Sequence, residues 1–577
     1  FIIGGFNGTL IFPGTGSLAS RSLVSVGQKD IYIAKMDCNK NLVWKNSIGS
    51  TGNECANFGF LKIKYDNKGN LYTIGAFSGS ATFTTTSGTS QILVSNGSDD
   101  IFLAKYDTLG VLIWSIKSGG TTTDEGCSIN IDYNGDIVIG GLFSGTATFG
   151  TTSGSTINKT GSASHDLFIA KYLPSGILQW VNTAGGAGLE LAIDICFDKQ
   201  NNIYIAGSFG YSGASTTFGT ITITNALKWG GFIAKTTSNG NWIWVNSMGS
   251  AADEGMSSCV LDEFSNVYTI GHFGLGNSAF SSNSPGSSLP LLNNGAYDVC
   301  MSSYDSAGVL RWVKVIGGTG VEYGWDICFN KENNLIASGY FNNTVNFGNS
   351  VILSSNGLGD GFICTVDPTN GSTINALKMG GSGEDYCYAT VPDNFGNLFT
   401  CGFFSNTATF GTNTLISSGA EDSYFAKIAP PNPFKLKPPV SINLCAGDSS
   451  ILYPIDTFSG VTFQWFRNNL AIAGANKFSY KAKLAGTYYL KVTNNCNEID
   501  SSETITLSFN TASVNAGNDV TICKGDSVQL NAIGATNYFW FPSIGLSNVN
   551  IANPYAKPAD TTTYIIRGVT GVCLVYD

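Results

Sequence analysis

The sequence predicts an all-β fold, namely a seven-bladed β-propeller followed by two immunoglobulin-like β-sandwich domains. Three observations predict it. A strand-rich pattern recurs between residues 1 and 428, a segment with five prolines follows at 429–440, and beyond it the order Cys, Trp, Tyr, Cys occurs twice. The expected strands are short, rich in β-branched and aromatic residues, and bounded by Gly, Asn or Asp.

Composition excludes several classes of protein. The chain has 577 residues, 71 of them glycine, a net charge of −10, and only 12% charged side chains against 12% aromatic ones. Such a chain is too apolar to be disordered, and an acidic chain without basic clusters would repel phosphate backbones. The sequence holds two histidines and no apolar run near the ~20 residues that span a bilayer. We therefore expect no nucleic-acid partner and no direct membrane span.

The repeat is anchored by an alanine strand that recurs every 62 to 70 residues. Its copies are IYIAK (31–35), IFLAK (101–105), LFIAK (167–171), GFIAK (231–235), VCMSS (299–303), GFICT (361–365) and SYFAK (423–427). In five copies a tryptophan follows ten residues after the alanine position, at Trp44, Trp114, Trp180, Trp244 and Trp312. A strand ending in an Asp-x-x-Gly-like turn comes next, and a nearly all-apolar strand ending in phenylalanine closes the unit.

Four strands per repeat predict the blades of a propeller. Runs such as IVIGGLF (137–143) do not alternate, so both faces should be covered, and stacked blades provide that burial. The alanine and phenylalanine strands each occur seven times and the other two six times, which makes 26 strands where seven four-stranded blades need 28. We therefore expect the chain to begin inside a blade, with further residues before Phe1.

At this point the residues resemble the seven-bladed propeller repeats of bacterial cell-surface proteins, with the pattern G-G-x-x-x-D/E … D-x-x-G-N-x-Y-x-x-G-x-F. The resemblance covers about residues 1–428. The resemblance implies a specific architecture but says little about activity, because propellers host many functions.

The C-terminal segment is expected to begin with a Pro-rich extended spacer (429–440), whose five prolines keep it outside any sheet. A first immunoglobulin-like domain (441–510) and a second, Ig/PKD-like domain (511–577) that stops before its final strand should follow. Residues 516–542 resemble the Ig/PKD-type modules of Bacteroidetes surface proteins, which often leave the cell by type IX secretion. The immunoglobulin-like layout implies that a tryptophan packs on an inter-sheet disulfide, here Cys445–Cys496 and Cys523–Cys573. Those disulfides imply an oxidising compartment.

The other ten cysteines lie in the repeats and form no CxxC pair, so a structural zinc site is unsupported. Cys196 and Cys328 occupy the same register in two strands, which favours small buried core residues.

A repeated carboxylate is the best candidate for chemistry. An acid stands five residues after the glycine that follows each tryptophan strand, at Glu54, Asp124, Glu190, Glu254, Glu322 and Asp385. A ring of carboxylates could bind calcium or a cationic or sugar-like ligand. Each acid could equally accept backbone N–H groups and hold its own loop. We favour the second interpretation, because identical recurrence suits a folding device. We expect no catalytic residue, no cofactor and no metal, calcium being the alternative.

Other polar residues have simpler explanations. The Asp-x-x-Gly turns lack the alternating oxygen ligands of a calcium loop. His165 and His272 have no partner pattern, and the register of the tryptophans favours core packing. Asp-Ser/Thr-apolar triplets, such as Asp107-Thr108-Leu109, resemble O-glycosylation sites of Bacteroidetes secreted proteins.

These observations favour a non-enzymatic binding or adhesion protein, extracellular or on the outer cell surface, and a cargo of type IX secretion. Its partners would be surface glycans or other cell-surface or secretion-machinery proteins. The platform would be the face of the propeller that carries the long Gly/Ser/Thr-rich loops, such as 78–99, and the sandwich modules would form a stalk. One alternative is an extracellular polysaccharide-active enzyme, which needs non-repeating carboxylates, or a carboxylate with Arg or His, that converge within catalytic reach. Another is a permanently docked subunit of a surface or secretion complex.

Overall fold

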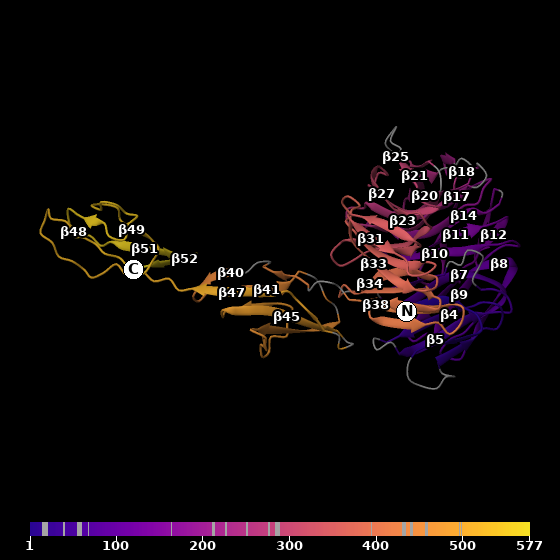
Figure 1. Ribbon diagram of the computed structural model, residues 1–577, viewed down its shortest axis with the longest axis horizontal. Helices are drawn as coiled ribbons and strands as arrows, with labels where there is room; N and C mark the ends of the chain where they lie inside the picture. Colours follow the sequence, from indigo (N-terminus) through magenta and orange to yellow (C-terminus); the bar gives the residue numbers. More distant parts are fainter. Residues whose placement is uncertain are drawn as a thin grey trace. The chain divides into compact units, whose positions relative to one another are not determined.

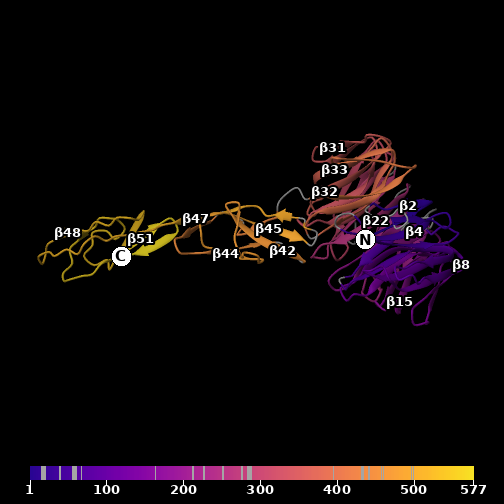
Figure 2. The same ribbon diagram turned by 90° about the horizontal axis from the view of Figure 1, so that it is seen from below.

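The computed structural model describes residues 1–577 apart from 14–20, 38–40, 55–60, 67, 163, 211–213, 225–227, 250–251, 275–276, 283–288, 394, 430–433, 439–441, 456–457, 459, 495–496 and 498. Contacts divide the chain into two units, Phe1–Ala429 and Pro430–Asp577. Both are built of β-strands, and their succession can be followed by colour in Figure 1 and from below in Figure 2.

The first unit is a β-propeller-type array of repeated antiparallel sheets. Four of them are six-stranded and share one strand order. The first consists of β10 (Glu125–Ile131), β11 (Ile137–Phe143), β14 (Asp166–Tyr172), β15 (Leu178–Gly186), β18 (Ser215–Phe218) and β19 (Ile221–Thr224). The second consists of β16 (Leu191–Phe197), β17 (Ile203–Gly210), β20 (Trp229–Thr236), β21 (Trp242–Gly249), β24 (Asn277–Phe280) and β25 (Leu289–Leu292).

The third and fourth six-stranded sheets repeat this order. The third consists of β22 (Glu254–Leu261), β23 (Val267–Gly274), β26 (Tyr297–Tyr304), β27 (Leu310–Gly318), β30 (Thr344–Gly348) and β31 (Val351–Ser354). The fourth consists of β28 (Glu322–Phe329), β29 (Leu335–Phe341), β32 (Asp360–Val366), β33 (Thr373–Gly381), β36 (Thr407–Phe410) and β37 (Asn413–Ile416). The last sheet of the unit has β34 (Asp385–Pro392), β35 (Leu398–Phe404) and β38 (Asp422–Ile428).

The N-terminal repeats share a nine-stranded sheet, because the long strands β7 and β8 each take part in two repeats. Its members are β1 (Ile2–Phe6), β4 (Asp30–Met36), β5 (Leu42–Gly49), β6 (Lys62–Tyr65), β7 (Asn70–Phe83), β8 (Gln91–Asp107), β9 (Leu112–Gly119), β12 (Thr146–Phe149) and β13 (Ile157–Thr160). A separate hairpin pairs β2 (Thr9–Ile11) with β3 (Ser22–Val24).

The six-stranded sheets correct the expectation of four strands per blade. The Gly/Ser/Thr-rich segments, expected to be loops, fold into a hairpin that pairs with the tryptophan strand of the preceding repeat, as β12–β13 do with β9. Buried and exposed residues alternate along these segments, as in a β-strand with one covered face. In β12, for example, Ala147 and Phe149 are buried while Thr146 is exposed. Each hairpin therefore couples one repeat to its neighbour.

Neighbouring sheets also pack face to face, and the hydrophobic core lies between them. One cluster, for example, joins Tyr72 and Ile74 of β7 to Phe143 of β11 and Phe168 of β14. The strands that follow the predicted acids contact one another in succession, and we call them the inner strands: β6, β10, β16, β22, β28 and β34. The inner strands from β10 to β34 each carry a β-bulge at the same register.

The tryptophan strands bind the next repeat through side chains. Trp44 Nε1 donates to Thr108 O at 2.9 Å, and Asn46 Nδ2 donates to Gly110 O at 2.7 Å. Trp244 and Asn246 repeat these bonds to Ser306 O and Gly308 O. The regular spacing of the tryptophans thus reflects packing between repeats.

The second unit holds two modules built of strands. The first module contains two sheets. One sheet consists of β39 (Leu436–Lys437), β41 (Ser450–Pro454) and β44 (Tyr480–Ala482). The other consists of β40 (Ile442–Cys445), β42 (Val461–Arg467), β43 (Leu470–Ala471), β45 (Gly486–Asn494), β46 (Ile499–Ser501) and β47 (Ile505–Asn510). The following module has β48 (Val528–Gln529), β49 (Asn537–Phe541), β50 (Tyr555–Ala556), β51 (Ile565–Thr570) and β52 (Cys573–Tyr576). Trp465 and Trp540 are buried in their respective modules.

Residues 434–438 of the predicted 429–440 spacer belong to the first of these modules. Phe434 is buried, and Leu436–Lys437 pair with β41. The expectation that this segment would stay outside a sheet is wrong, because the two apolar residues between its prolines gain burial by joining the ladder.

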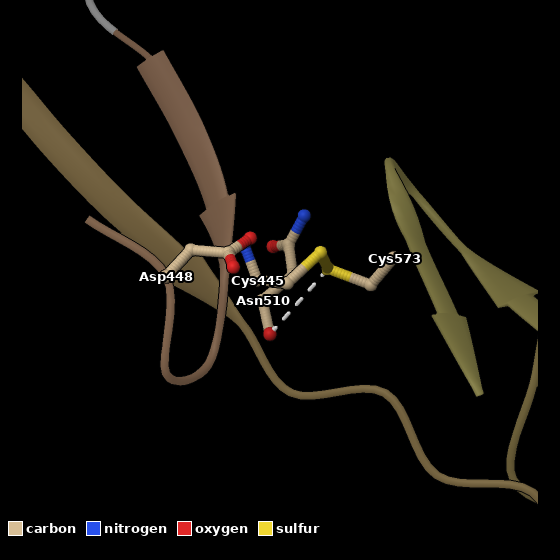
Figure 3. Close-up of a disulfide and its surroundings, with 4 residues drawn as sticks. All are labelled: Cys445, Asp448, Asn510 and Cys573. Atoms are coloured by element: carbon tan, nitrogen blue, oxygen red, sulfur yellow. Dashed lines mark hydrogen bonds between the residues drawn. A yellow bond between two sulfur atoms is a disulfide. The ribbon is translucent and has the colours of Figure 1, made fainter. Parts of the chain in front are cut away.

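The predicted disulfide pairing is also wrong. Cys445 bonds to Cys573, so the bridge links the two C-terminal modules rather than two sheets of one module (Figure 3). Cys445 ends β40 beside Asn510 of β47, and Cys573 begins β52, which brings their Cα atoms to 5.4 Å. Cys523 is a free, exposed thiol, and Cys496 lies outside the described residues.

Candidate functional site

A continuous group of ring side chains lies on three neighbouring sheets of the first unit. We call it the aromatic cluster, and its members are His272, Tyr297, Tyr323, Trp325, Tyr340, Tyr386, Tyr388 and Phe403. They project from β23, β26, β28, β29, β34 and β35.

The cluster depends on side chains that do not recur in every repeat. Trp325 and Tyr388 are the bulged residues of their inner strands, where two earlier repeats hold Cys127 and Ile193. The other cluster members on the inner strands, and those on the strands that pair with them (which we call the second strands), also differ from the residues of earlier repeats. Tyr323 and Tyr386 match Glu125 and Leu191, while His272, Tyr340 and Phe403 match Leu142 and Ser208. A feature confined to neighbouring repeats is what a binding site requires and a folding device does not.

The rings pack closely but leave one face accessible. Tyr340 and Tyr386 stack with centroids 4.4 Å apart at 17°, and Trp325 lies 5.7 Å from Tyr388. Tyr388 is 43% exposed. Since aromatic rings combine an apolar face with a polar edge, such a surface offers both stacking and hydrogen bonding.

Polar groups border the cluster. The Tyr297 hydroxyl reaches Asp253 Oδ2, and the Tyr386 hydroxyl reaches Glu384 Oε2, each at 3.5 Å. Trp325 Nε1 and His272 Nδ1 are buried atoms for which the described residues provide no hydrogen-bond partner. Burial lowers the pKa of His272 to about 4, so its ring is neutral near pH 7. Buried indole and imidazole nitrogens are normally paired, so these two atoms are exceptions within the described residues.

A second group of side chains converges from separate inner strands. We call it the polar cluster, and it consists of Lys62, Asp194, Ser258 and Asp326. Ser258 Oγ lies 2.8 Å from Asp194 Oδ2 and 3.1 Å from Asp326 Oδ1, while Lys62 Nζ lies 3.9 Å from Asp194 Oδ1. Lys62 on β6 thereby reaches β16 past β10. Asp326 directly follows Trp325, so the two clusters are contiguous along β28.

The carboxylates of the polar cluster already have partners within the protein. Asp194 Oδ2 accepts the Cys259 amide at 3.1 Å, and Asp326 Oδ2 accepts the Thr390 amide at 2.9 Å. Burial would lower the pKa of Lys62, but attraction by Asp194 and Asp326 raises it above its ordinary value. The group is thus a charged network that ties four inner strands together.

The six predicted acids are all buried, and each bonds groups close to its own loop. Asp124 accepts the amides of Gly120 and Ser144, while Glu322 accepts Gly318 N–H at 2.9 Å. The remaining four make equivalent bonds: Glu54 with Ser50, Glu190 with Gly186 and Thr216, Glu254 with Ser278, and Asp385 with Gly381. These contacts agree with the loop-holding interpretation.

Five of these acids also face a second carboxylate, at the start of the alanine strand. The pairs are Asp30 with Glu54, Asp100 with Asp124, Asp166 with Glu190, Asp298 with Glu322, and Asp360 with Asp385. Gly230 stands at the matching position opposite Glu254. Burial is the main effect that raises the pKa of these acids, and the neighbouring carboxylate adds to it. The pKa is about 7 for Glu54, Asp124 and Glu190 and about 8 for Glu322.

The remaining sequence candidates have local roles. Asp132 Oδ1 accepts the amides of Asn134 and Asp136 within its turn, as expected for an Asx turn. His165 contacts the Ser164 hydroxyl. Among the described residues, no three His, Cys, Asp or Glu side chains gather in a way that could hold a metal ion.

Sequence reasoning missed both clusters. The sequence shows no partner pattern around His272, and the departures of the inner strands from the repeat appear only when the bulges align the strands. The available signal is the concentration of Tyr, Trp and Phe at three register positions of the last repeats.

Comparison with known proteins supports the repeat architecture, although no family model matches the sequence. The chain is 23% identical over 265 residues to uncharacterized WD repeat-containing protein L264 of Acanthamoeba polyphaga mimivirus, which covers 41% of this chain and 19% of that protein. It is 24% identical over 352 residues to regulatory protein FlaEY of Caulobacter vibrioides, covering 58% and 35%. The chain thus spans about a fifth and a third of these relatives. WD repeats build propeller blades, which agrees with the repeated sheets.

Similarity to solved structures is remote. Quinohemoprotein alcohol dehydrogenase from Comamonas testosteroni aligns with a TM-score of 0.34 and 10% identity over 74% of this chain and 76% of that one. The N-terminal four Ig domains of Dscam1 isoform 4.44 align with a TM-score of 0.13 and 9% identity over 78% and 99%. Likenesses at this level carry no argument about fold or function.

Proposed function

We propose that this chain is a non-enzymatic glycan-binding protein located outside the cytoplasm, with the aromatic cluster as its binding surface. The observation that carries the proposal is the gathering of eight rings on neighbouring sheets, seven of them at positions where two earlier repeats hold small, acidic or aliphatic residues. The sequence alone favoured a loop face as the platform, whereas the proposed surface lies on the inner and second strands.

The chemistry of the surface favours a saccharide. A sugar ring carries C–H groups on its faces, which suit the exposed ring of Tyr388, and hydroxyls around its edge. Asp253 and Glu384 could accept hydroxyl protons. A purely apolar ligand would leave these polar groups unsatisfied.

The architecture in this proposal is a seven-bladed propeller with two immunoglobulin-like modules. Seven phenylalanine strands support the blade number: β1, β7, β11, β17, β23, β29 and β35. The buried Trp465 and the bond from the Tyr488 hydroxyl to Leu484 O, at 2.7 Å, support an immunoglobulin-like first module. A stalk role for these modules and type IX secretion rest on the sequence resemblance.

The location is supported by the Cys445–Cys573 disulfide, since disulfides persist in oxidising compartments. Within the described part of the chain, we find no helix with the length and apolarity needed to cross a membrane.

One observation favours the alternative of a polysaccharide-active enzyme. Asp194 and Asp326 occupy one register position at which three other repeats hold Ser or Ala, and the Ser258 hydroxyl lies between the two carboxylates. We prefer the binding function because both carboxylates already accept backbone amides and Asp194 also lies beside Lys62. A catalytic pair needs oxygens free to meet the scissile bond and a water.

The test compares Tyr388→Ala with Tyr133→Ala. Tyr133 is 67% exposed in an Asp-x-x-Gly turn, at the other end of its inner strand from the acids. The probes are hexasaccharides of β-linked glucose, N-acetylglucosamine and xylose, followed by calorimetry and product analysis. We expect one probe to bind, Tyr388→Ala to weaken it at least tenfold, and Tyr133→Ala to leave it unchanged. Absence of binding, or equal loss in both variants, would overturn the proposal, and product release would favour the enzyme.

A further inference from the structure

We infer that Cys196 and Cys259 form a disulfide in the mature protein, which joins the inner strands β16 and β22. Both are free thiols in this structure, and their Sγ atoms lie 2.9 Å apart. A disulfide bond is about 2.05 Å long, so the two sulfur atoms need to approach by less than about 1 Å to form one. The inference rests on the extracytoplasmic location in the proposed function, and it is independent of the glycan.

The polar cluster holds the two cysteines in register. Asp194 lies two residues before Cys196 on β16, and its Oδ2 accepts both the Cys259 amide and the Ser258 hydroxyl of β22. The two inner strands belong to different sheets and are not paired by a backbone ladder. One aspartate therefore fixes the approach of β22 to β16 at the level of the thiols.

The surroundings of the pair are apolar. Cys196 and Cys259 belong to the same buried cluster as Tyr204, Trp244 and Met256. Burial raises the pKa of both thiols, so the folded protein holds them as thiols rather than reactive thiolates. We expect the bond to form before the sheets close over it, and to resist exchange afterwards.

The chemistry requires an oxidant, for which we name a disulfide-bonded thiol oxidoreductase of the extracytoplasmic space. Each cysteine loses the hydrogen of its S–H group, and a bond forms between the two Sγ atoms. The two electrons and two protons pass to the disulfide of the oxidoreductase, which becomes a pair of thiols. The route is ordinary thiol–disulfide exchange through a mixed disulfide.

The chain provides its own matched control. Cys328 occupies on β28 the register that Cys196 occupies on β16, because Cys328 pairs with Ile336 as Cys196 does with Tyr204. On the neighbouring inner strand, the residue that matches Cys259 is Thr390. Cys328 should therefore remain a thiol in every preparation.

The test is a peptide map of the full chain secreted from an oxidising compartment. The protein is denatured with an alkylating reagent and no reductant, and then cleaved after Lys and Arg. We expect residues 172–199, which hold Cys196, to be linked to 236–311, which hold Cys259, while Cys300 and Cys328 are alkylated. Alkylation of both Cys196 and Cys259 overturns the inference.

The Cys445–Cys573 bridge separates this failure from a failure of the proposed location. If that bridge is present and Cys196 is alkylated, the location stands and the inference fails. If neither bond is present, both fail for native material. Refolding with oxidised glutathione then tests the pair itself, and free thiols there also overturn it.

Variants give a second readout. Adding reductant during thermal unfolding of the first unit should lower its midpoint by several degrees in the wild type and in Cys328→Ser. In Cys259→Ser the reductant should have no effect on that midpoint. An equal reductant effect in Cys259→Ser would also overturn the inference.

Discussion

Asp100 and Asp124 face one another over Gly119, where a Cβ atom would lie 2.5 Å from Asp100 Oδ1 and 3.0 Å from Asp124 Oδ2. Gly119 also has a φ of +150°, so glycine suits this position on both grounds. Asp100 Oδ1 has no hydrogen-bond partner among the described residues. Two buried carboxylates that repel one another cannot both ionise without cost, so Asp124 keeps its proton to a higher pH than an exposed aspartate does.

These pairs predict a stability that depends on pH. Burial and the facing carboxylate raise the pKa of Asp124 to about 7, and burial raises that of Asp100 to about 6. The folded state then binds more protons than the unfolded state between about pH 4 and pH 8, so stability falls as pH rises through this range. One unit of pKa corresponds to about 1.4 kcal/mol, so we expect the melting temperature of the first unit to drop by several degrees from pH 5 to pH 8.

A neutral substitution tests the origin of this dependence. Asp124→Asn removes one titrating group and keeps an acceptor for only one of the two backbone amides, so it should lower stability at every pH while the melting temperature falls less steeply with pH. Glu263→Gln, at an exposed turn position, is the control and should retain the full slope. Identical slopes in the two variants would refute a role for the pair.

The link between repeats through Asn246 predicts a local loss of stability. Asn246 is buried, and its amide donates to Gly308 O of the next repeat at 2.7 Å. Asn246→Ala would leave that carbonyl without its donor, and we expect a loss of about 1–3 kcal/mol in the free energy of unfolding, measured with urea. Asn158→Ala on the exposed side of β13 should change it by less than about 0.5 kcal/mol.

Repetition explains how much of this fold could be predicted. The alanine and tryptophan strands recur at fixed spacing, so their strand character and order followed from the sequence. The outer hairpins did not, because Gly, Ser and Thr resemble a loop unless the alternation of Ala147 and Phe149 is weighed. The buried acids follow from the same recurrence, because each one holds an equivalent loop in its own repeat.

The candidate site escaped prediction because it consists of departures from the repeat. Trp325 and Asp326 gain meaning only when β28 is aligned with its neighbours at the bulge, whose position no single repeat reveals. The disulfide failed for a related reason. Cys445 ends β40 beside Asn510, the last residue of the module's final strand β47. At this point the next module begins, and its Cys573 lies within bonding distance.

The bridge between Cys445 and Cys573 predicts a coupling of the two C-terminal modules. The bonded residues are 128 apart in sequence, and a disulfide typically stabilises by about 2–4 kcal/mol, more for longer loops. Cys445→Ser should lower the melting temperature of the second unit and leave the transition of the first unchanged. Cys523→Ser, at the exposed free thiol, should affect neither. A calorimetric scan of the full chain separates the two transitions.

The polar cluster predicts a compensating set of variants. Asp194→Asn with Asp326→Asn would leave the partly buried Lys62 ammonium without its two carboxylates. We expect a loss of about 2 kcal/mol in the free energy of unfolding, because an uncompensated charge remains among the inner strands. Adding Lys62→Met removes that charge and should restore most of the loss, since replacing a whole buried ion pair by apolar groups is often close to neutral. Urea unfolding of the wild type, the double variant and the triple variant provides the comparison. A triple variant no more stable than the double variant would show that Lys62 does not depend on these carboxylates.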